Sequence, residues 1–458
     1  MEHLLKTTAE RAQRYLDGLN SRSVGPPPEG IANLQRLDEP LPEAPTDPEV
    51  VVALLDEIGS PATVATAGPR YFGFVCGGSL PATVAANWLA TAWDQNAGVV
   101  ALSPVAAKLE ETAMGWLLDV LRLPSDCGVG FVTCATQANL SGLIAARHAL
   151  LARQGWDVEA EGLFGAPPIK VVVGDEVHVS VLRALMVLGL GRERVIRVPV
   201  DGQGRMRADS LPTLDQETIV CIQAGNVNTG AFDPADEIIP QTKAAGAWVH
   251  VDGAFGLWAA AAPSRAHLVK GFADADSWAT DAHKWLNAPY DSGLVIVREP
   301  QHLRAAFSIT ADYLVRGERR EPEDYTPEFS RRARGVEVWA ALRSLGRSGL
   351  ADLIERTCRH ATRFAEGLRR AGYEILNDVV SNQVLVSFGD AATTRRVIAA
   401  IQEEGTCWAG PSIWQGHTAM RISVSSWATT DDDVERSLEA MIRVAARVRQ
   451  GESSTPQT

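Results

Sequence analysis

The stretch 277-SWATDAHKWLNAPYDSG-293 joins a short strand pattern to a lysine in unusual surroundings. Lys284 lies between His283 and Trp285, although the chain carries arginine at most cationic positions. Its lysines are Lys6, Lys108, Lys170, Lys243, Lys270 and Lys284. A desolvated lysine can lose its proton and form a Schiff base with a carbonyl, which arginine cannot do. The alternative is a lysine whose stem covers apolar surface, and this segment alone leaves both open.

The strand pattern that precedes Lys284 is one of a series. Short apolar, β-branched runs occupy 129–134, 169–175, 194–200, 218–224, 247–253, 276–281 and 293–299, and helical spacing fills several of the gaps. Short apolar strands alternating with helices predict an α/β domain with a mostly parallel seven-stranded sheet covered on both faces. Ligands in such domains bind at the carboxyl ends of the strands.

The regions before and after this domain do not continue the alternation of strands and helices. The first 22 residues predict an amphipathic helix, and the proline-rich, acidic range 21–48 predicts an extended arm. Such an arm either wraps a partner subunit or lies on the surface of its own chain. After about residue 300, helices and a few strands predict a small α+β domain. The predicted divisions are 1–75 (N-terminal helix and arm), 76–310 (large domain), 311–450 (small C-terminal domain) and 451–458 (disordered tail).

Composition narrows the class of protein. The net charge of −13 argues against a nucleic-acid surface, which needs a basic stripe. The N-terminus lacks the apolar core of a signal peptide, and no apolar run approaches membrane-spanning length. The cysteines show no metal-binding spacing and favour reduced thiols. We therefore expect a cytoplasmic protein without a membrane segment, a nucleic-acid partner or a metal site.

Four strand ends carry residues that could bind a ligand or take part in a reaction. Residues 133–142, TCATQANLSG, form a strand-to-helix junction suited to an anion, although Thr136 could instead be a helix N-cap. His178 follows the second run and is by itself an unremarkable histidine. Asp252 precedes the small residues Gly253 and Ala254, and is either a ring-facing carboxylate or a buried structural one. The fourth strand end leads to Lys284.

Together these strand ends satisfy the needs of one cofactor, pyridoxal phosphate. Its phosphate needs hydrogen-bond donors, and its aldehyde needs a lysine. Its pyridine nitrogen needs a carboxylate partner, which keeps the ring protonated and able to accept electrons.

From about Pro69 to Ser426, the chain resembles the group II pyridoxal-phosphate-dependent amino-acid decarboxylases, relatives of aromatic-amino-acid and glutamate decarboxylases. The motifs HVDGAFG (250–256) and DAHKW (281–285) carry this resemblance. It implies a fold type I, PLP-dependent transferase-like large domain. It also implies a homodimer with shared active sites, to which the arm adds a weak hint.

The resemblance also implies individual roles. Lys284 forms the Schiff base, Asp252 pairs with the pyridinium nitrogen, Ala254 packs against the ring, and His178 stacks on its other face. Tyr313, in TADYLVRG, takes the position of the acid that reprotonates the substrate carbon. The phosphate is expected at Ala135, Thr136, Asp281 or its neighbours, and His283.

Three positions depart from the family pattern. Asn226 and Val227 replace a threonine pair near the cofactor, so a contact from Asn226 is in doubt. Cys134 replaces a small residue in the phosphate loop. Asn96 replaces an apolar residue of the aromatic-substrate enzymes, which favours a polar substrate. The remaining candidates for the substrate pocket are Phe74, Cys76, Trp408 and Arg421.

The predicted reaction is removal of the α-carboxylate from an L-amino acid, giving an amine and CO2. An aminotransferase or a carbon–carbon or carbon–sulfur lyase would use the same parts, and Arg421 bears on this choice. It either clamps an α-carboxylate, which favours chemistry at another bond, or is structural. A non-catalytic cofactor-binding protein is the remaining alternative. The sequence does not identify the amino acid.

Overall fold

The computed structural model describes residues 1–308 and 319–451, which form two compact units. Unit 1 contains Met1–Gly78, His360–Leu376 and Val384–Thr458, of which 452–458 lie outside the described residues. Unit 2 contains Ser79–Arg359 and Asn377–Gln383. The sequence placed a division at residue 310, whereas unit 2 continues to Arg359. The four predicted ranges stay predictions of domain organisation.

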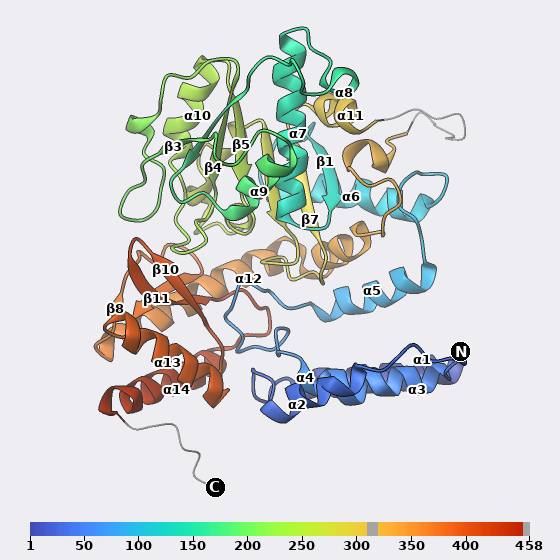
Figure 1. Cartoon of the computed structure of the whole chain (residues 1–458), viewed down its shortest axis with the longest axis vertical. Coiled ribbons are helices and arrows are strands. Elements are labelled where there is room, and N and C mark those ends of the chain that lie inside the picture. Colours follow the sequence, from blue (N-terminus) through green and yellow to red (C-terminus); the bar gives the residue numbers. More distant parts are fainter. Residues whose placement is uncertain (309–318, 452–458) are drawn as a thin grey trace. The chain divides into compact units, whose positions relative to one another are not determined.

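Unit 2 is built on a seven-stranded sheet with the order β1-β7-β6-β5-β4-β2-β3 (Figure 1). Its strands are β1 (Gly128–Val132), β2 (Lys170–Gly174), β3 (Ile196–Val198), β4 (Thr218–Gln223), β5 (Trp248–Asp252), β6 (Ser277–Asp281) and β7 (Gly293–Val297). Only β7 runs against its neighbours, because its pairings with both β1 and β6 are antiparallel. The sheet is therefore mostly parallel, and each of the seven predicted runs overlaps a strand.

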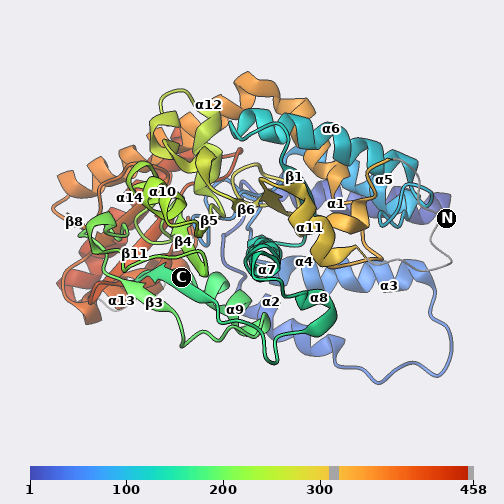
Figure 2. The ribbon, with the colours of Figure 1, turned by 90° about the horizontal axis from the view of Figure 1, so that it is seen from above.

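Helices bury both faces of this sheet, which explains why its central strands read as continuous apolar runs. In Figure 2, α7 (Ala135–Arg153) is seen nearly end-on, grouped with α8 (Val158–Glu161), α9 (Val179–Val187) and α11 (Pro300–Phe307). On the other face, α10 (Ala235–Ala244) packs against β5. One buried cluster joins α7 and α9 to the strands through alanine, valine and leucine side chains. This cluster fixes α7 against β5, β6 and β7.

The other elements of unit 2 lie before β1, between β3 and β4, or after β5. They are α5 (Pro81–Trp93), α6 (Pro104–Val120) and the 3₁₀ helices η3 (Ala208–Ser210), η4 (Gly256–Ala261), η5 (Ala266–Val269), η6 (Phe272–Asp274) and η7 (Pro322–Tyr325). Helix α12 (Gly335–Arg370) continues from unit 2 into unit 1. At Gly346 its backbone leaves the helical region, with φ of 60° and ψ of −176°. Glycine adopts such a positive φ at little steric cost.

Unit 1 contains a smaller sheet with the order β10-β11-β9-β8. Its elements are α1 (Glu2–Gly18), α2 (Pro28–Asn33), η1 (Leu34–Leu37), α3 (Pro48–Leu54), η2 (Leu55–Gly59), α4 (Ser60–Ala62), β8 (Glu374–Ile375), β9 (Gln383–Ser387), α13 (Ala391–Glu404), β10 (Gly410–Trp414), β11 (His417–Ser423) and α14 (Asp431–Gln450). Figure 1 shows α13 and α14 side by side next to this sheet. The predicted combination of a large α/β unit with a smaller α+β unit is confirmed.

Two expectations about unit 1 need correction. The range 21–48 is not wholly extended, because α2 and η1 lie within it. Pro28 starts α2, and its fixed φ suits the first helical position. Strand β10 was not predicted, because its burial alternates with exposed residues and it contains a proline. Across the described residues, no helix is both long and apolar enough to cross a membrane.

Candidate active site

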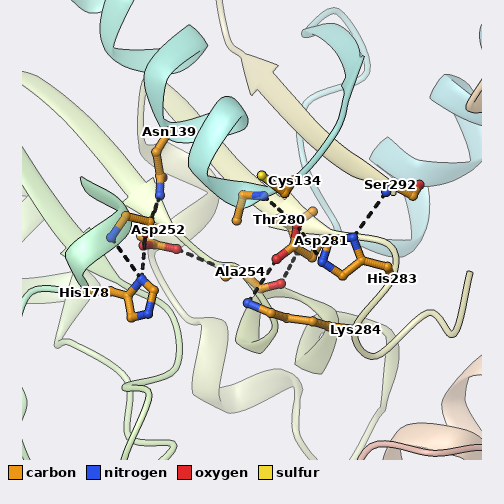
Figure 3. A network of polar contacts seen from close by, with 12 residues as sticks. Cys134, Asn139, His178, Asp252, Ala254, Thr280, Asp281, His283, Lys284 and Ser292 are labelled. Atoms are coloured by element: carbon orange, nitrogen blue, oxygen red, sulfur yellow. Dashed lines mark hydrogen bonds and ion pairs between the residues drawn. The ribbon is translucent and has the colours of Figure 1, made fainter. Parts of the chain in front are cut away.

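The site lies where two neighbouring parallel strands end. Strands β5 and β6 pair with Asp252 opposite Ala279, so Asp252 and Asp281 close the two strands at the same edge of the sheet. Both side chains are buried. The turn after β6 then carries His283 and Lys284. Figure 3 shows Lys284 and Asp281 on one side of Ala254, with Asp252 and His178 on the other.

Lys284 directs its amine at a buried carboxylate. Its Nζ lies 3.0 Å from Asp281 Oδ2, and its side chain is 18% exposed, whereas that of Asp281 is 3% exposed. The ion pair neutralises a carboxylate that burial would otherwise penalise heavily. The lysine is therefore held in one place and remains reachable by a small molecule.

Asp252 accepts hydrogen bonds on both oxygens. The Ala254 amide donates to Oδ1 at 3.2 Å, while Asn139 Nδ2 and Ser180 Oγ donate to Oδ2 at 3.1 and 3.2 Å. Hydrogen bonds to the charged form of a carboxylate favour that form. Three donors therefore surround the carboxylate at the end of β5.

His178 is linked to the same carboxylate through Ser180. It is the N-cap of α9, and its Nδ1 lies 3.2 Å from the Ser180 amide nitrogen. The Ser180 hydroxyl lies 2.7 Å from this Nδ1 and 3.2 Å from Asp252 Oδ2. Helix α9 therefore places a histidine ring and a hydroxyl beside Asp252.

The expected anion cradle is the N-terminus of α7. The helix begins at Ala135 with Cys134 as its N-cap, and the Cys134 side chain makes no capping bond. The alternative interpretation of Thr136 as the N-cap is therefore wrong. Instead, the Ala135 amide donates to Asp281 Oδ1 at 2.5 Å. The partial positive charge of a helix N-terminus stabilises that carboxylate and would equally stabilise a phosphate.

A glycine lets β7 approach this cradle. A Cβ added to Gly293 would lie 2.6–2.8 Å from the backbone atoms of Cys134. Only glycine fits so close an approach, so Gly293 holds the start of α7 against the sheet.

His283 lies beside the cradle and is 5% exposed. Its Nδ1 accepts from the Ser292 amide at 3.2 Å, which leaves the proton of a neutral ring on Nε2, 3.5 Å from Asp281 Oδ1. The ring stacks on Tyr290 with centroids 4.2 Å apart. Burial lowers the pKa of His283. His283 is therefore a neutral ring whose Nε2–H is directed toward the cradle.

Other predicted residues have different surroundings. Asn226 is buried, and its side chain donates to Glu176 and accepts from the amides of Asn228 and Thr229. These hydrogen bonds show that the Asn226 side chain stabilises the turn in which it lies. Asn96 Oδ1 accepts from the amides of Gly98 and Arg331, and its Nδ2 donates to Ser330 Oγ at 3.3 Å, so its carboxamide is held by its own surroundings.

Unit 1 contains four further predicted residues: Phe74, Cys76, Trp408 and Arg421. There, Phe74 and Trp408 stack with centroids 5.8 Å apart, and burial lowers the pKa of Arg421. Tyr313 lies outside the described residues.

Sequence analysis missed the side chains that support Asp252. Asn139, Ser180 and His250 were not singled out, although the spacing contained a signal. His250 precedes Asp252 by two residues, which places both on the same face of β5. Asn139 follows the cradle by one helical turn, on the α7 face that contacts β5.

These residues fit pyridoxal phosphate. Lys284 offers a reachable amine, and Asp252 offers a buried anion supported by three donors. The α7 N-terminus offers backbone N–H groups without a side-chain cap from Cys134, and His283 offers a further donor. Among the described residues, no group of His, Cys, Asp and Glu could hold a metal ion.

Comparisons with known proteins agree with this chemistry. The family model "Pyridoxal-dependent decarboxylase conserved domain" matches residues 32–389. The chain is 28% identical over 361 residues to an aromatic-L-amino-acid decarboxylase of Bacillus atrophaeus, covering 74% of this chain and 72% of that protein. It is 28% identical over 438 residues to an L-2,4-diaminobutyrate decarboxylase of Rhizobium meliloti, covering 88% and 83%.

Solved structures share the fold. Oryza sativa TDC with PLP and tryptamine superposes with a TM-score of 0.89 at 21% identity, covering 97% of both chains. Mouse CSAD in its apo form gives a TM-score of 0.88 at 21% identity, covering 97% of this chain and 98% of the other. The family match covers most of the chain, so its cofactor is pyridoxal phosphate and its activity is that of an amino-acid carboxy-lyase. The chain belongs to the pyridoxal-dependent decarboxylase family.

Proposed function

We propose that this enzyme removes the α-carboxylate of an L-amino acid through the residues gathered at the ends of β5 and β6. The observation that supports this most directly is the placement of Lys284 and Asp252 on either side of Ala254. The amine is reachable and the carboxylate is buried with three donors. This separates an amine that, once deprotonated, can attack a carbonyl from an anion that can hold a ring nitrogen protonated.

Pyridoxal phosphate, when bound, supplies a ring that accepts the electron pair left behind as CO2 departs. The chain's part is to hold that ring and its charge. Asp252 would keep the ring nitrogen protonated, with Asn139 and Ser180 fixing the carboxylate. Ala254, at the turn after β5, would present a short side chain to one face, and His178 would cover the other. Lys284 would anchor the aldehyde.

The phosphate would lie at the N-terminus of α7, near Ala135, Thr136 and His283. Backbone N–H groups and the Nε2–H of His283 can donate to it. Asp281 accepts only, so its carboxylate cannot donate to a phosphate. We assign Asp281 to holding Lys284 in place, which refines its predicted role as a direct cofactor ligand.

Two parts of the proposal rest on sequence. Tyr313 remains the proposed proton donor to the substrate carbon. A homodimer with shared active sites, in which the N-terminal arm contacts the partner, remains the proposed assembly. Because Asn96 is bonded to backbone groups, its carboxamide adds no support for a polar substrate.

A panel of the twenty common amino acids tests the proposal. The enzyme is incubated with each, and CO2, the corresponding amine and the corresponding keto acid are measured. We expect CO2 and amine in equal amounts from one or a few amino acids, and neither from the Lys284→Arg variant. Keto acid as the main product would instead show an aminotransferase. Cofactor binding without turnover of any amino acid would favour a non-catalytic protein.

A further inference from the structure

A row of buried side chains connects Asp252 to the interior of the sheet. Trp248 and His250 come from β5, Ser277 from β6, and Asn139 from α7. Their exposed fractions are 2% for Trp248 and 0% for the other three. Successive polar atoms lie within hydrogen-bond distance, from the Trp248 indole to Asp252 Oδ2. Four buried residues therefore form a hydrogen-bonded row that reaches the carboxylate through Asn139.

At the Trp248 end, the hydrogen bonds allow donation in the direction of His250. An indole N–H can only donate, and it donates to Ser277 Oγ at 2.9 Å. The Ser277 proton is then free to go to His250 Nδ1, 2.8 Å away. This places the proton of a neutral imidazole on Nε2, which donates to Asn139 Oδ1 at 2.8 Å.

The other end of the row requires the same direction. The Asp252 carboxylate accepts only, so Asn139 must turn its NH2 group toward Oδ2, at 3.1 Å. Its oxygen then faces His250 and requires a donor there. The Asp252 end therefore leaves one arrangement, in which His250 carries its proton on Nε2.

The surroundings keep the His250 ring neutral and in place. Burial lowers the pKa of His250 to about 4, with the charge of Asp252 acting in the opposite direction. Helix α7 leaves room for the ring at Gly142, one turn after Asn139. A Cβ at Gly142 would lie 2.8 Å from His250 Cε1 and 2.9 Å from Nδ1. The same helical face thus supplies both the hydrogen-bond acceptor and the space.

We propose that His250 is a positioning residue for the reaction, which acts through Asn139 to hold the Asp252 carboxylate ionised and aimed at the ring nitrogen of the cofactor. This inference rests on the proposed role of Asp252. It extends the machinery of the site to Trp248 and Ser277, which lie behind His250. If any hydrogen bond of the row were lost or reversed, the Asn139 amide could rotate and present its oxygen to the carboxylate.

The first test uses the protein without cofactor. Histidine side chains are labelled with ¹⁵N, and the His250 signals are assigned by their absence from the His250→Gln variant. We expect the proton on Nε2, an unprotonated Nδ1, and no titration between about pH 5.5 and 8. A proton on Nδ1, or an ordinary titration in that range, would overturn the proposal. This arm is independent of cofactor chemistry, so it separates a failure here from a failure of the proposed function.

The second test uses two buried tryptophans on neighbouring strands. The Trp248 indole donates into the row, whereas the Trp278 indole donates to the Phe272 carbonyl. Trp248→Phe should lower kcat about tenfold with little change in KM, and should shift the pH dependence of the cofactor's visible absorption band. Trp278→Phe should leave both unchanged in the folded enzyme. Equal effects of the two variants on kcat and on the absorption band would contradict the proposal.

A matched pair at His250 completes the test. Glutamine offers one donor and one acceptor, as the neutral imidazole does, whereas phenylalanine offers neither. We expect His250→Gln to retain more activity than His250→Phe, and to keep the absorption band closer to that of the unmodified enzyme. If His250→Phe does not fold, Asn139→Leu replaces it, since it removes the link between His250 and Asp252. An absorption band unaffected by either substitution would overturn the proposal.

Discussion

The Lys284 amine lies 3.0 Å from Asp281 Oδ2, and the other oxygen of Asp281 accepts from the first amide of α7. One buried carboxylate thus contacts both the proposed anchor of the cofactor and the proposed cradle of its phosphate. Because the carboxylate and the phosphate would share the cradle, their charges oppose each other.

Asp281→Asn should therefore strengthen binding of pyridoxal phosphate. Asparagine keeps an oxygen for the Ala135 amide but removes the negative charge beside the phosphate. A repulsion of about 1 kcal/mol corresponds to an affinity gain of about fivefold. Equilibrium titration of the apoprotein measures it. Pyridoxal without phosphate is the control and should gain nothing, so equal gains for both ligands would place the phosphate elsewhere.

Asp252→Asn should separate cofactor attachment from chemistry. The amide keeps the shape of the side chain but loses the charge that stabilises a protonated ring nitrogen. We expect cofactor still attached to Lys284 and kcat reduced by about 100-fold or more. Steady-state kinetics with the identified substrate measures this effect.

Asp276→Asn is the matched control for that variant. Asp276 is also buried in the sheet of unit 2, where it pairs with Lys243 and accepts from the Val249 amide. Its substitution should lower stability and leave kcat of the folded enzyme near its original value. A comparable loss of kcat in both variants would show that Asp252 is structural.

The buried His250 should make the enzyme sensitive to acid. Its pKa falls from 6.5 to about 4 on folding, so the unfolded chain binds a proton between these values and the folded chain does not. Titration of His250 therefore leaves the free energy of unfolding unchanged above pH 6.5 and lowers it as the pH falls toward 4. The shift corresponds to roughly 3 kcal/mol.

Comparing the enzyme with its His250→Gln variant isolates this effect. Asp233, whose pKa burial raises to about 6, titrates in the same window with the opposite sign and is present in both proteins. The difference in unfolding free energy between the two proteins should shrink from pH 7 to pH 4 in denaturant titrations. A difference that stays constant would mean that His250 titrates normally.

Glu110 should matter for stability rather than chemistry. Its carboxylate oxygens lie 2.7 and 2.9 Å from Arg331 Nη2, with both side chains 1% exposed, and Arg320 lies 3.6 Å away. Removing one partner of a buried ion pair leaves an uncompensated charge. Glu110→Gln should lower the free energy of unfolding by about 3 kcal/mol.

The neighbouring residue provides the control. Glu111 pairs with Lys108 on the surface, where both side chains are more than half exposed. Glu111→Gln should change the free energy of unfolding by under about 1 kcal/mol. Similar losses in both variants would indicate a general effect on α6 and not the buried ion pair.

The sequence predicted the sheet of unit 2 well because most of its strands are buried on both faces and read as short apolar runs. It predicted the fourth strand of the small sheet poorly, since β10 alternates between exposed and partly buried residues around Pro411. The range 21–48 looked extended because proline dominates its composition, yet Pro28 begins a helix.

For the candidate site, too, the sequence predicted some residues and missed others. Lys284 and Asp252 were predicted because they lie in the motifs DAHKW and HVDGAFG at strand ends, whereas the role of His178 was predicted from the family resemblance. Asn139 and His250 were missed because they lie on different elements, and only the packing of α7 against β5 brings them together. Asn226 was expected near the cofactor, but its bonds to Glu176 and to its own turn depend on a loop conformation that the sequence did not predict.

The attachment of the cofactor to Lys284 is the centre of this account. The holoenzyme is reduced with borohydride, digested, and its peptides are analysed by mass spectrometry for a phosphopyridoxyl group on lysine. We expect the group on Lys284, and on none of Lys6, Lys108, Lys170, Lys243 and Lys270. Modification of another lysine in place of Lys284, or no modification in a preparation that decarboxylates its substrate, would contradict the account.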